Sequence, residues 1–306
     1  MASVSFTSAQ AAAHAAAADQ NYPAGALYVV ATPIGNLADI SLRALHVLHL
    51  MDSIACEDTR HTQQMLRAYG VDKSSRQLLA VHQHNESEAA LSVIERLRDG
   101  QRVAYVSDAG TPGISDPGAR VCNAVREAGL RCIPLPGASS VTCLLSVAGV
   151  VSDSGFVFQG FLPSKGTERT QVVTALAGEP RAVVLLEAPH RIEALAAALS
   201  KMGSRQLTLG RELTKQFEEI ATLQAQSLPE WLASDPNRLR GEFAIVLHAA
   251  DVAGQKGDTE RILALLLAEL PLKTAVRLAA EITAEPRNAL YERALAFKKD
   301  GRPSEY

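Results

Sequence analysis

The chain has 306 residues, of which 47% are hydrophobic and 21% charged, and its 30 basic and 33 acidic side chains leave a formal net charge of −3. This balance excludes the generally basic surface that is typical of free-standing nucleic-acid binders, so any contact with nucleic acid must come from local patches. The length predicts two domains, each large enough to bury its own core.

Residues 1–24 are rich in Ala, Ser and Gln, and they lack the basic start and leucine-rich stretch of a secretory signal. We expect a loosely ordered extension there, with a frayed helix over 9–18. No apolar run reaches the roughly 18–20 residues that a membrane span needs. Cys56, Cys122, Cys132 and Cys143 form no Cys-x-x-Cys pair, which indicates reduced thiols in a cytoplasmic protein.

Between residues 25 and 150, short apolar runs alternate with amphipathic ones. We predict strands over 26–32, 53–57, 77–82, 102–108 and 131–136, and helices over 41–50, 59–70, 87–100 and 116–129. This order is typical of an open, mostly parallel sheet that is covered by helices. Ligands of such sheets bind beyond the carboxyl ends of the strands, so the loops at those ends are the candidate site.

A polar, turn-rich stretch at 149–155 marks the expected start of a second domain, 151–250. There we predict strands over 156–161, 181–188, 206–213, 217–225 and 242–250, with helices over 167–178 and 190–203. The last three strands follow one another directly, which favours a mixed sheet with antiparallel pairs. After a hydrophilic linker, helices over 259–270, 272–283 and 286–299 form a small C-terminal domain, 258–300.

The most unusual loop is SDAGTPGISDPG at 107–118, which has three glycines and two prolines after an apolar strand. It matches neither a Walker loop nor Gly-x-Gly-x-x-Gly, which argues against a nicotinamide cofactor. Asp108 and Asp116 would repel phosphate, so the loop suits a ligand with a cation and hydroxyls. The alternative is a purely structural turn.

A second loop, CEDTRHT at 56–62, places Glu57, Asp58, Arg60 and His61 at another strand end. Two carboxylates, a guanidinium and an imidazole can orient a hydroxyl and take its proton. The alternative is an ordinary helix start with Asp58 near the positive end of the helix dipole.

Four other segments lie at expected strand ends. TPIGNLADIS at 32–41 leaves room for backbone approach, and PLPGASS at 134–140 offers backbone donors. HQHNE at 82–86 has two imidazoles without a third ligand at metal spacing, so we expect no metal site there. EAPHR at 187–191 contains Glu187, which either reaches an interdomain cleft or pairs with a nearby arginine.

Taken together and in order, eight segments of the chain closely resemble the RsmI family. They are LYVVATPIGNLADISLRAL, EDTRHT, HQHNE, VSDAGTPGISDPG, PLPGASS, GFLPSKG, EAPHR and RELTK. These are ribosomal small-subunit RNA 2′-O-methyltransferases of the tetrapyrrole-methylase fold group. The resemblance covers about 27–250, and the helices of 259–299 resemble the family's small C-terminal domain.

The resemblance implies an α/β chain with a doubly wound parallel N-terminal domain and a mixed-sheet second domain, with S-adenosylmethionine between them. It also implies a cytoplasmic homodimer without a metal, whose acceptor is a cytidine ribose in the decoding region of 16S rRNA in the small ribosomal subunit. The alternatives are a methylase of a small tetrapyrrole and a non-catalytic ribosome assembly factor.

By position in these motifs, the resemblance assigns roles to individual residues. Cofactor contacts fall on Pro33, Gly35, Asp108, Ala109, Gly110, Thr111, Ile114, Ser115, Ala138, Ser139, Phe161 and Glu187. Substrate contacts fall on His84, Asn85, Asp116, Lys165, Arg191, Arg211 and Lys215. Glu57, Asp58 and His61 are candidate general bases, and Arg60 is a candidate phosphate ligand. Residues 59–76 and 160–215 each carry three more basic than acidic side chains, which fits local phosphate contacts.

Overall fold

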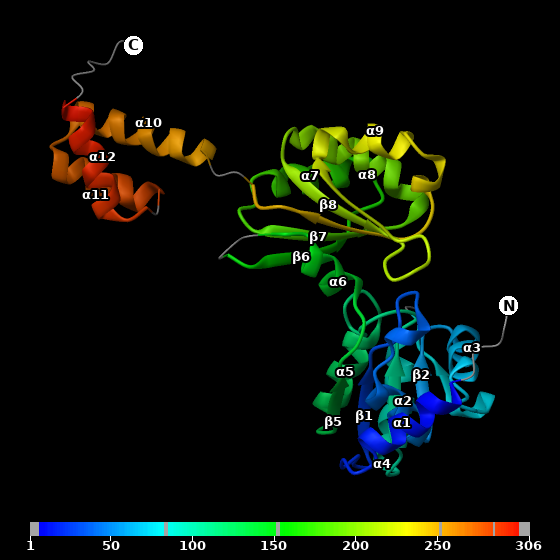
Figure 1. Cartoon of the computed structure of the whole chain (residues 1–306). Helices are drawn as coiled ribbons and strands as arrows, with labels where there is room; N and C mark the ends of the chain where they lie inside the picture. Colours follow the sequence, from blue (N-terminus) through cyan, green and yellow to red (C-terminus); the bar gives the residue numbers. More distant parts are fainter. Residues whose placement is uncertain (1–5, 83–84, 151–153, 251–252, 284, 300–306) are drawn as a thin grey trace.

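The computed structural model describes residues 6–82, 85–150, 154–250, 253–283 and 285–299. Its first part is a parallel sheet with strand order β3-β2-β4-β1-β5 (Figure 1). The strands are β1 (Ala26–Val30), β2 (Ser53–Cys56), β3 (Leu78–Ala80), β4 (Val103–Val106) and β5 (Arg131–Leu135). β2 and β4 are buried along their whole length, because helices cover both faces of the sheet. The predicted α/β fold class is confirmed.

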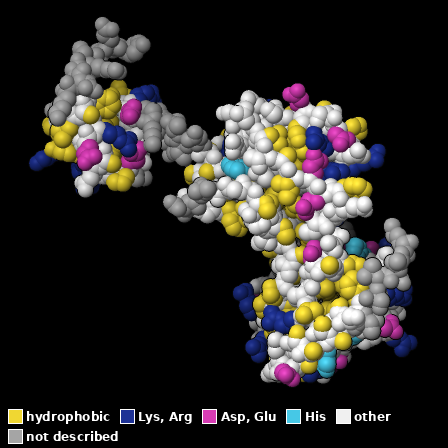
Figure 2. Space-filling view, in the orientation of Figure 1, with side chains coloured by type: hydrophobic (Ala, Val, Ile, Leu, Met, Phe, Trp, Pro, Cys, Tyr) yellow, Lys and Arg dark blue, Asp and Glu magenta, His cyan; other side chains and the backbone are white. Residues whose placement is uncertain are grey.

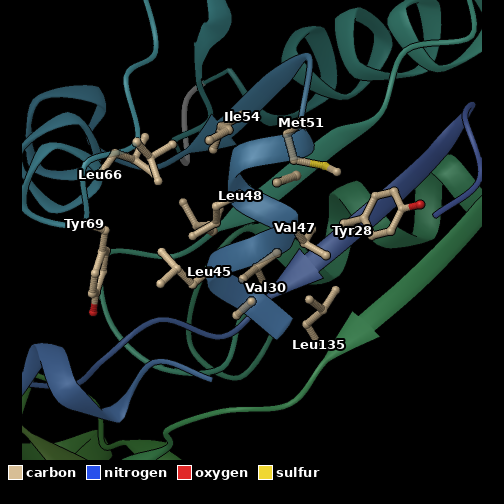
Figure 3. Close-up of a cluster of buried hydrophobic side chains, with 14 of the residues drawn as sticks. Tyr28, Val30, Leu45, Val47, Leu48, Met51, Ile54, Leu66, Tyr69 and Leu135 are labelled. Carbon is tan, nitrogen blue, oxygen red and sulfur yellow. The ribbon is translucent and has the colours of Figure 1, made fainter. Parts of the chain in front are cut away.

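Two helical layers enclose this sheet. Its helices are α1 (Thr7–Ala17), α2 (Leu42–Leu50), α3 (Thr59–Ala68), α4 (Glu86–Arg98) and α5 (Gly118–Glu127). On one face, side chains of α2 and α3 meet those of β1 and β2 in the cluster of Figure 3, where Leu66 lies near Ile54 and Val47 lies near Tyr28. α4 and α5 pack against the opposite face through a second cluster.

Helix α1 lies in the segment for which we expected a loosely ordered extension. Its Ala13 and Ala17 are buried, and α1 packs alongside α2. Phe6, just before the helix, makes an edge-on ring contact with Tyr69 at 5.0 Å between centroids. These contacts hold α1 on the core cluster of the first sheet.

The second sheet has the strand order β6-β7-β10-β8-β9. The strands are β6 (Phe156–Phe161), β7 (Ala182–Glu187), β8 (Gln206–Arg211), β9 (Glu219–Gln224) and β10 (Phe243–Leu247). β6 pairs with β7 in parallel, whereas all other pairs are antiparallel, so the predicted mixed sheet is confirmed. β9 alternates between half-buried and exposed positions, as an edge strand with one solvated face does.

The two faces of the second sheet are covered by different parts of the chain. α7 (Gly166–Ala177), α8 (Ile192–Leu199) and α9 (Leu228–Ala233) pack on one face. α6 (Ser140–Val147) precedes the expected domain boundary, yet its Leu144 packs with Val184 and Val246 on the other face. α6 therefore belongs to the second sheet by its contacts and connects the two halves (Figure 1).

The last part of the chain consists of α10 (Ala253–Glu269), α11 (Leu272–Thr283) and α12 (Arg287–Lys299), which share a core of their own and lie apart from both sheets in Figure 1. α10 begins at Ala253 rather than at the predicted 259, since polar residues do not stop a helix and the chain has no proline between 251 and 270. No helix in the described ranges is both long and apolar enough to cross a membrane.

Short 3-10 helices complete the described secondary structure. They are η1 (Leu37–Asp39), η2 (Ser75–Gln77), η3 (Pro189–Arg191), η4 (Ser200–Met202), η5 (Ala225–Ser227) and η6 (Pro236–Leu239).

Candidate active site

The loops that leave β1, β4 and β5 are tied into one surface at the carboxyl end of the first sheet. Thr32 N–H donates to the Gly110 carbonyl at 3.0 Å, and Gly110 N–H donates back at 3.1 Å. Thr111 Oγ1 donates to the Ala138 carbonyl at 3.0 Å. Gly110 has φ +83°, and a Cβ there would lie 3.2 Å from Ile34 Cγ2, so only glycine fits easily. Three loops that are distant in sequence therefore form one rigid platform.

Asp116 braces the 107–118 loop from inside. Its Oδ1 accepts hydrogen bonds from Tyr105 Oη at 3.1 Å and Gly118 N–H at 2.8 Å, and its Oδ2 accepts from Gly113 N–H at 2.7 Å. Burial, with the nearby Asp116 charge, raises the pKa of Tyr105 and keeps its hydroxyl a donor. Asp116, for which we expected a substrate contact, thus has both oxygens engaged within its own loop.

A chain of carboxylates connects β2 with β4. Asp108 N–H donates to Glu57 Oε1 at 3.1 Å, and Asp58 N–H donates to Asp108 Oδ1 at 3.2 Å. Burial raises the pKa of Glu57, and the charges of Asp108 and Asp116 act in the same direction.

Asp58 caps helix α3. Its Oδ1 accepts from the N–H groups of Arg60 at 2.8 Å and His61 at 3.3 Å, and these two bonds lower its pKa. Glu57 and Asp58 thereby hold Asp108 and the start of α3 in place. The capped helix start that we considered as an alternative for this segment is therefore present.

Two cavities lie between this platform and the second sheet. Cavity A has a volume of about 320 Å³, and cavity B one of about 430 Å³. Cavity A is lined by Ile34, Ala109, Ser115, Ser140, Phe161, Leu186, Glu187, Ala188, Pro189, Leu213, Glu242, Phe243 and Ala244. Cavity B is lined by Pro33, Ile34, Gly35, Leu37, His61, Gln64, Met65, Ala68, Asp108, Ala109, Lys215 and Glu242. Ile34, Ala109 and Glu242 belong to both walls.

Many of the residues assigned from sequence meet at these cavities. Of these residues, the wall of cavity A includes Ala109, Ser115, Phe161 and Glu187. The wall of cavity B includes Pro33, Gly35, His61, Asp108, Ala109 and Lys215. Gly110, Thr111 and Ala138 lie in the hydrogen-bonded platform behind them. Ser139 occupies the N-cap position of α6, and Ile114 is exposed on its loop.

Lys215 reaches from the loop between β8 and β9 across to the first domain. Its Nζ donates to Glu212 Oε1 and Glu242 Oε2, both at 2.8 Å. Burial alone would lower the pKa of Lys215, but these two carboxylates raise it above its usual value. The loop has positive φ at two non-glycine residues, Glu212 at 51° and Thr214 at 68°, a strained backbone of the kind found at functional sites.

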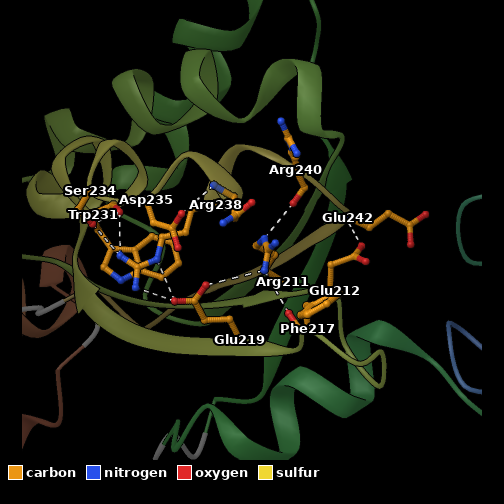
Figure 4. A network of polar contacts seen from close by, with 11 residues as sticks. Arg211, Glu212, Phe217, Glu219, Trp231, Ser234, Asp235, Arg238, Arg240 and Glu242 are labelled. Carbon is orange, nitrogen blue, oxygen red and sulfur yellow. Dashed lines mark hydrogen bonds and ion pairs between the residues drawn. The ribbon is translucent and has the colours of Figure 1, made fainter.

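Arg211 supports the base of this loop instead of reaching a cavity (Figure 4). Its Nε donates to the Arg240 carbonyl at 2.9 Å, and an Nη donates to the Phe217 carbonyl at 3.1 Å. Glu219 lies 3.8 Å from Arg211 and also pairs with Arg238, whose guanidinium lies 4.1 Å above the Trp231 ring. Arg211, for which we expected a substrate contact, therefore holds the base of the loop between β8 and β9 in place.

Two other residues assigned to substrate, Asn85 and Lys165, lie away from the cavity walls. Asn85 accepts from His82 N–H at 2.8 Å and donates to the Ala80 carbonyl at 3.0 Å, which closes the loop after β3. Lys165 is exposed at the start of α7 and lies 3.5 Å from Glu168. His84 lies outside the described residues.

Buried Glu187 and partly exposed Arg191 form an ion pair beside cavity A. The Glu187 side chain is fully buried, and its Oε1 accepts from Ala188 N–H at 3.0 Å. Arg191 Nε lies 3.1 Å from the same oxygen, at an angle that makes no hydrogen bond, and its Nη2 donates to the Leu162 carbonyl. Within the described part of the chain, Glu187 Oε2 has no hydrogen-bond partner.

The sequence did not reveal the apolar wall of cavity B or much of cavity A. Leu37, Met65 and Ala68 come from η1 and α3, Leu213 comes from the loop after β8, and Phe243 comes from β10. Glu242 could have been suspected, because an acid directly precedes the apolar run of β10. The others look like ordinary core residues in sequence.

S-adenosylmethionine carries a cation, an exocyclic amine and hydroxyls. The residues that line the cavities fit such a molecule. Asp108, Glu187 and Glu242 offer acidic acceptors, and one oxygen of Glu187 is buried with no donor among the residues that the structure describes. A buried unpaired acceptor costs free energy until a donor arrives, so this site calls for a ligand with N–H groups.

Two sheets with a pair of cavities between them, together with the family match over residues 26–229, identify the chain as a methyltransferase of the two-domain α/β type. It belongs to the tetrapyrrole methylase family, in the group of the ribosomal RNA small subunit methyltransferase I proteins. Residues 26–229 match the family described as Tetrapyrrole (Corrin/Porphyrin) Methylases, and residues 253–298 match the RsmI C-terminal HTH domain.

Individual relatives support this assignment. Ribosomal RNA small subunit methyltransferase I of Xylella fastidiosa is 47% identical over 271 residues, 87% of this chain and 98% of the relative. That of Neisseria meningitidis serogroup A is 45% identical over 289 residues, 93% and 98% of the two chains. The crystal structure of a diphthine synthase shares the fold with a TM-score of 0.56 at 17% identity, over 73% of this chain and 90% of that one. The chain is an enzyme, and its methyl donor is S-adenosylmethionine.

Proposed function

We propose that the enzyme transfers a methyl group from S-adenosylmethionine to the 2′-oxygen of a cytidine ribose in the decoding region of 16S rRNA. It acts on the small ribosomal subunit, in the cytoplasm, as a homodimer. The names of its relatives support a small-subunit rRNA substrate. The observation that carries the proposal is the pair of cavities with a common wall at Ile34, Ala109 and Glu242.

The common wall suits a transfer between two bound molecules. Methyl transfer is an in-line displacement, so acceptor oxygen and methyl carbon must be held about 3–3.5 Å apart and on one axis. Cavity A, with Phe161 and Glu187, would hold the cofactor against the platform of Gly110, Thr111 and Ala138, and Asp108, which lines cavity B beside the shared Ala109, would reach the cofactor from that side. Cavity B, with its apolar wall of Leu37, Met65 and Ala68, would hold the acceptor nucleotide. The cofactor supplies an electrophilic methyl group when it is bound.

His61 is the base candidate whose side chain reaches cavity B. Glu57 and Asp58 are occupied in holding backbone N–H groups, which supports a positioning role for them. Arg60 is 92% exposed at the start of α3, where it can contact a phosphate. His61 would take the ribose proton as the new C–O bond forms.

Contact with the rest of the ribosomal particle falls to surface patches. Basic and acidic side chains are interspersed over the face shown in Figure 2, without a continuous basic surface. The match of 253–298 to an HTH domain supports a nucleic-acid contact by the C-terminal helices. Recognition would then depend on the shape of the folded particle, with modest affinity for naked RNA.

The test is transfer of a labelled methyl group to small ribosomal subunits that lack the modification. We expect incorporation into 16S rRNA, with the label on a cytidine ribose, and none into subunits that already carry the mark. Label on a base, or transfer only to a small tetrapyrrole, would replace the proposal with the corresponding alternative. Cofactor binding without transfer to any acceptor would favour an assembly factor.

A further inference from the structure

The most unusual polar group outside the platform is the second carboxylate oxygen of Glu187. The side chain ends β7, is fully buried and lines cavity A. Its Oε1 accepts a hydrogen bond from Ala188 N–H and forms an ion pair with the Arg191 guanidinium. Its Oε2 has no hydrogen-bond partner in the described ranges. A buried carboxylate oxygen without a donor destabilises the folded protein, because its lost hydration is not replaced. A bound ligand that donates a hydrogen bond to this oxygen would remove the cost.

The charge of the pair limits which donor fits. Arg191 lies 3.1 Å from Glu187, so the two side chains together are neutral and do not call for a further cation. The surrounding wall is largely apolar, with Phe161, Leu213 and Phe243. A flat, neutral ring with an N–H donor on its edge fits both conditions.

We infer that Glu187 Oε2 accepts a hydrogen bond from the exocyclic amino group of a nucleobase, and that Glu187 thereby selects an amino base over an oxo base. This inference rests on the proposed function, which supplies two such bases: the adenine of the cofactor and the cytosine of the acceptor. Glu187 lines cavity A and not cavity B, which favours adenine.

The cofactor arm compares two product analogues by calorimetry on the full chain. S-adenosylhomocysteine presents an amine at ring position 6, and S-inosylhomocysteine presents a carbonyl oxygen there. The wild type should prefer the adenosyl compound. Glu187→Gln replaces an acceptor oxygen with an amide donor, so it should weaken adenosyl binding about 10- to 100-fold and strengthen inosyl binding. The ratio of the two affinities is the readout, because a general loss of structure cancels from it.

The acceptor arm uses small subunits whose target cytidine is replaced by uridine, which has an oxo group in place of the amine. If the cofactor ratio does not change but Glu187→Gln loses the preference for cytidine over uridine, the contact is to the acceptor base. Glu193→Gln, an exposed acid on α8, is the matched control and should change neither ratio. If Glu187→Gln changes neither ratio, Glu187 is only the partner of Arg191 and the inference is wrong. Failure of the wild type to bind S-adenosylhomocysteine would instead count against the proposed function.

Discussion

The stem of Lys215 lies directly against Gly35, so that the two domains touch at this point beside cavity B. A Cβ on residue 35 would lie 2.3 Å from Lys215 Cγ and 2.9 Å from its Cε. The glycine of the TPIGNL loop is therefore required by a side chain from the other domain. The sequence had indicated only that the loop leaves room for close approach.

Gly35→Ala should displace Lys215 from its bonds to Glu212 and Glu242 without unfolding the first domain. Because Lys215 lines cavity B, we expect acceptor binding to weaken about tenfold, the effect of losing one charge-assisted hydrogen bond from its Nζ to the acceptor. Binding of unmodified small subunits, measured alongside the melting temperature, checks this. Gly166→Ala, at a position with nothing within 4 Å, is the control and should bind normally. Equal loss in both variants would contradict the argument.

Asp108→Ala should weaken cofactor binding sharply while the fold stays intact. Asp108 lines cavity B beside Ala109, which belongs to the wall shared with cavity A, and its Oδ1 accepts from Asp58 N–H at 3.2 Å, so the change removes an acidic acceptor next to the cofactor and loosens the start of α3. Calorimetry with S-adenosylhomocysteine is the measurement. Unchanged affinity would remove Asp108 from the cofactor site.

His61→Ala should lower the single-turnover rate on small subunits by about 10²–10⁴-fold if His61 acts as the general base. The His61 side chain is exposed, and only the backbone N–H of His61 takes part in the cap by Asp58, so the alanine variant keeps the cap. The free energy of unfolding should therefore change little. Gln64→Ala, on the same wall of cavity B, controls for the loss of contact area: it should weaken acceptor binding but leave the single-turnover rate at saturating subunits unchanged. A wild-type rate in His61→Ala would show that positioning alone is sufficient.

Glu57→Gln should raise the melting temperature at neutral pH. The pKa of Glu57 is raised in the folded protein, so its ionised form is less stable there than in the unfolded chain. The free energy of unfolding that Glu57 contributes therefore falls as the pH rises above its usual pKa of 4.5. The uncharged glutamine keeps an acceptor for Asp108 N–H and avoids this loss. The gain should disappear below about pH 4 in thermal melts, and a constant gain at every pH would contradict this explanation.

Acid should weaken the packing of α1 on α2. Burial lowers the pKa of His46, and the nearby His14, 5.5 Å away between ring centroids, acts in the same direction. As the pH decreases below the usual histidine pKa of 6.5, His46 takes up a proton more readily in the unfolded chain than in the folded protein. The free energy of unfolding therefore decreases as the pH decreases in that range. Thermal melts between pH 7.5 and 5.5 should show the fall, and it should be smaller in His46→Gln. An identical fall in that variant would assign the effect to other histidines.

The parallel sheet could be predicted from sequence because its central strands are continuous apolar runs, as in Val103–Val106. The site could be predicted only in part. Asp116 and Arg211 have the composition of ligands, yet they brace loops through partners that sequence does not show. Leu37 and Met65 look like core residues, and they become a cavity wall only when η1 and α3 are placed side by side. Tertiary contacts decide which polar residues are free and which apolar ones are exposed to a ligand.

The common wall of the two cavities has a thermodynamic consequence. A molecule in cavity A and one in cavity B both contact Ile34, Ala109 and Glu242, so neither can bind without altering the surface offered to the other. If bound cofactor changes the affinity for the acceptor by some factor, linkage requires that bound acceptor changes the affinity for the cofactor by the same factor. The same reciprocity holds for the two products, so loss of spent cofactor changes the affinity for modified RNA by the factor by which loss of modified RNA changes the affinity for spent cofactor.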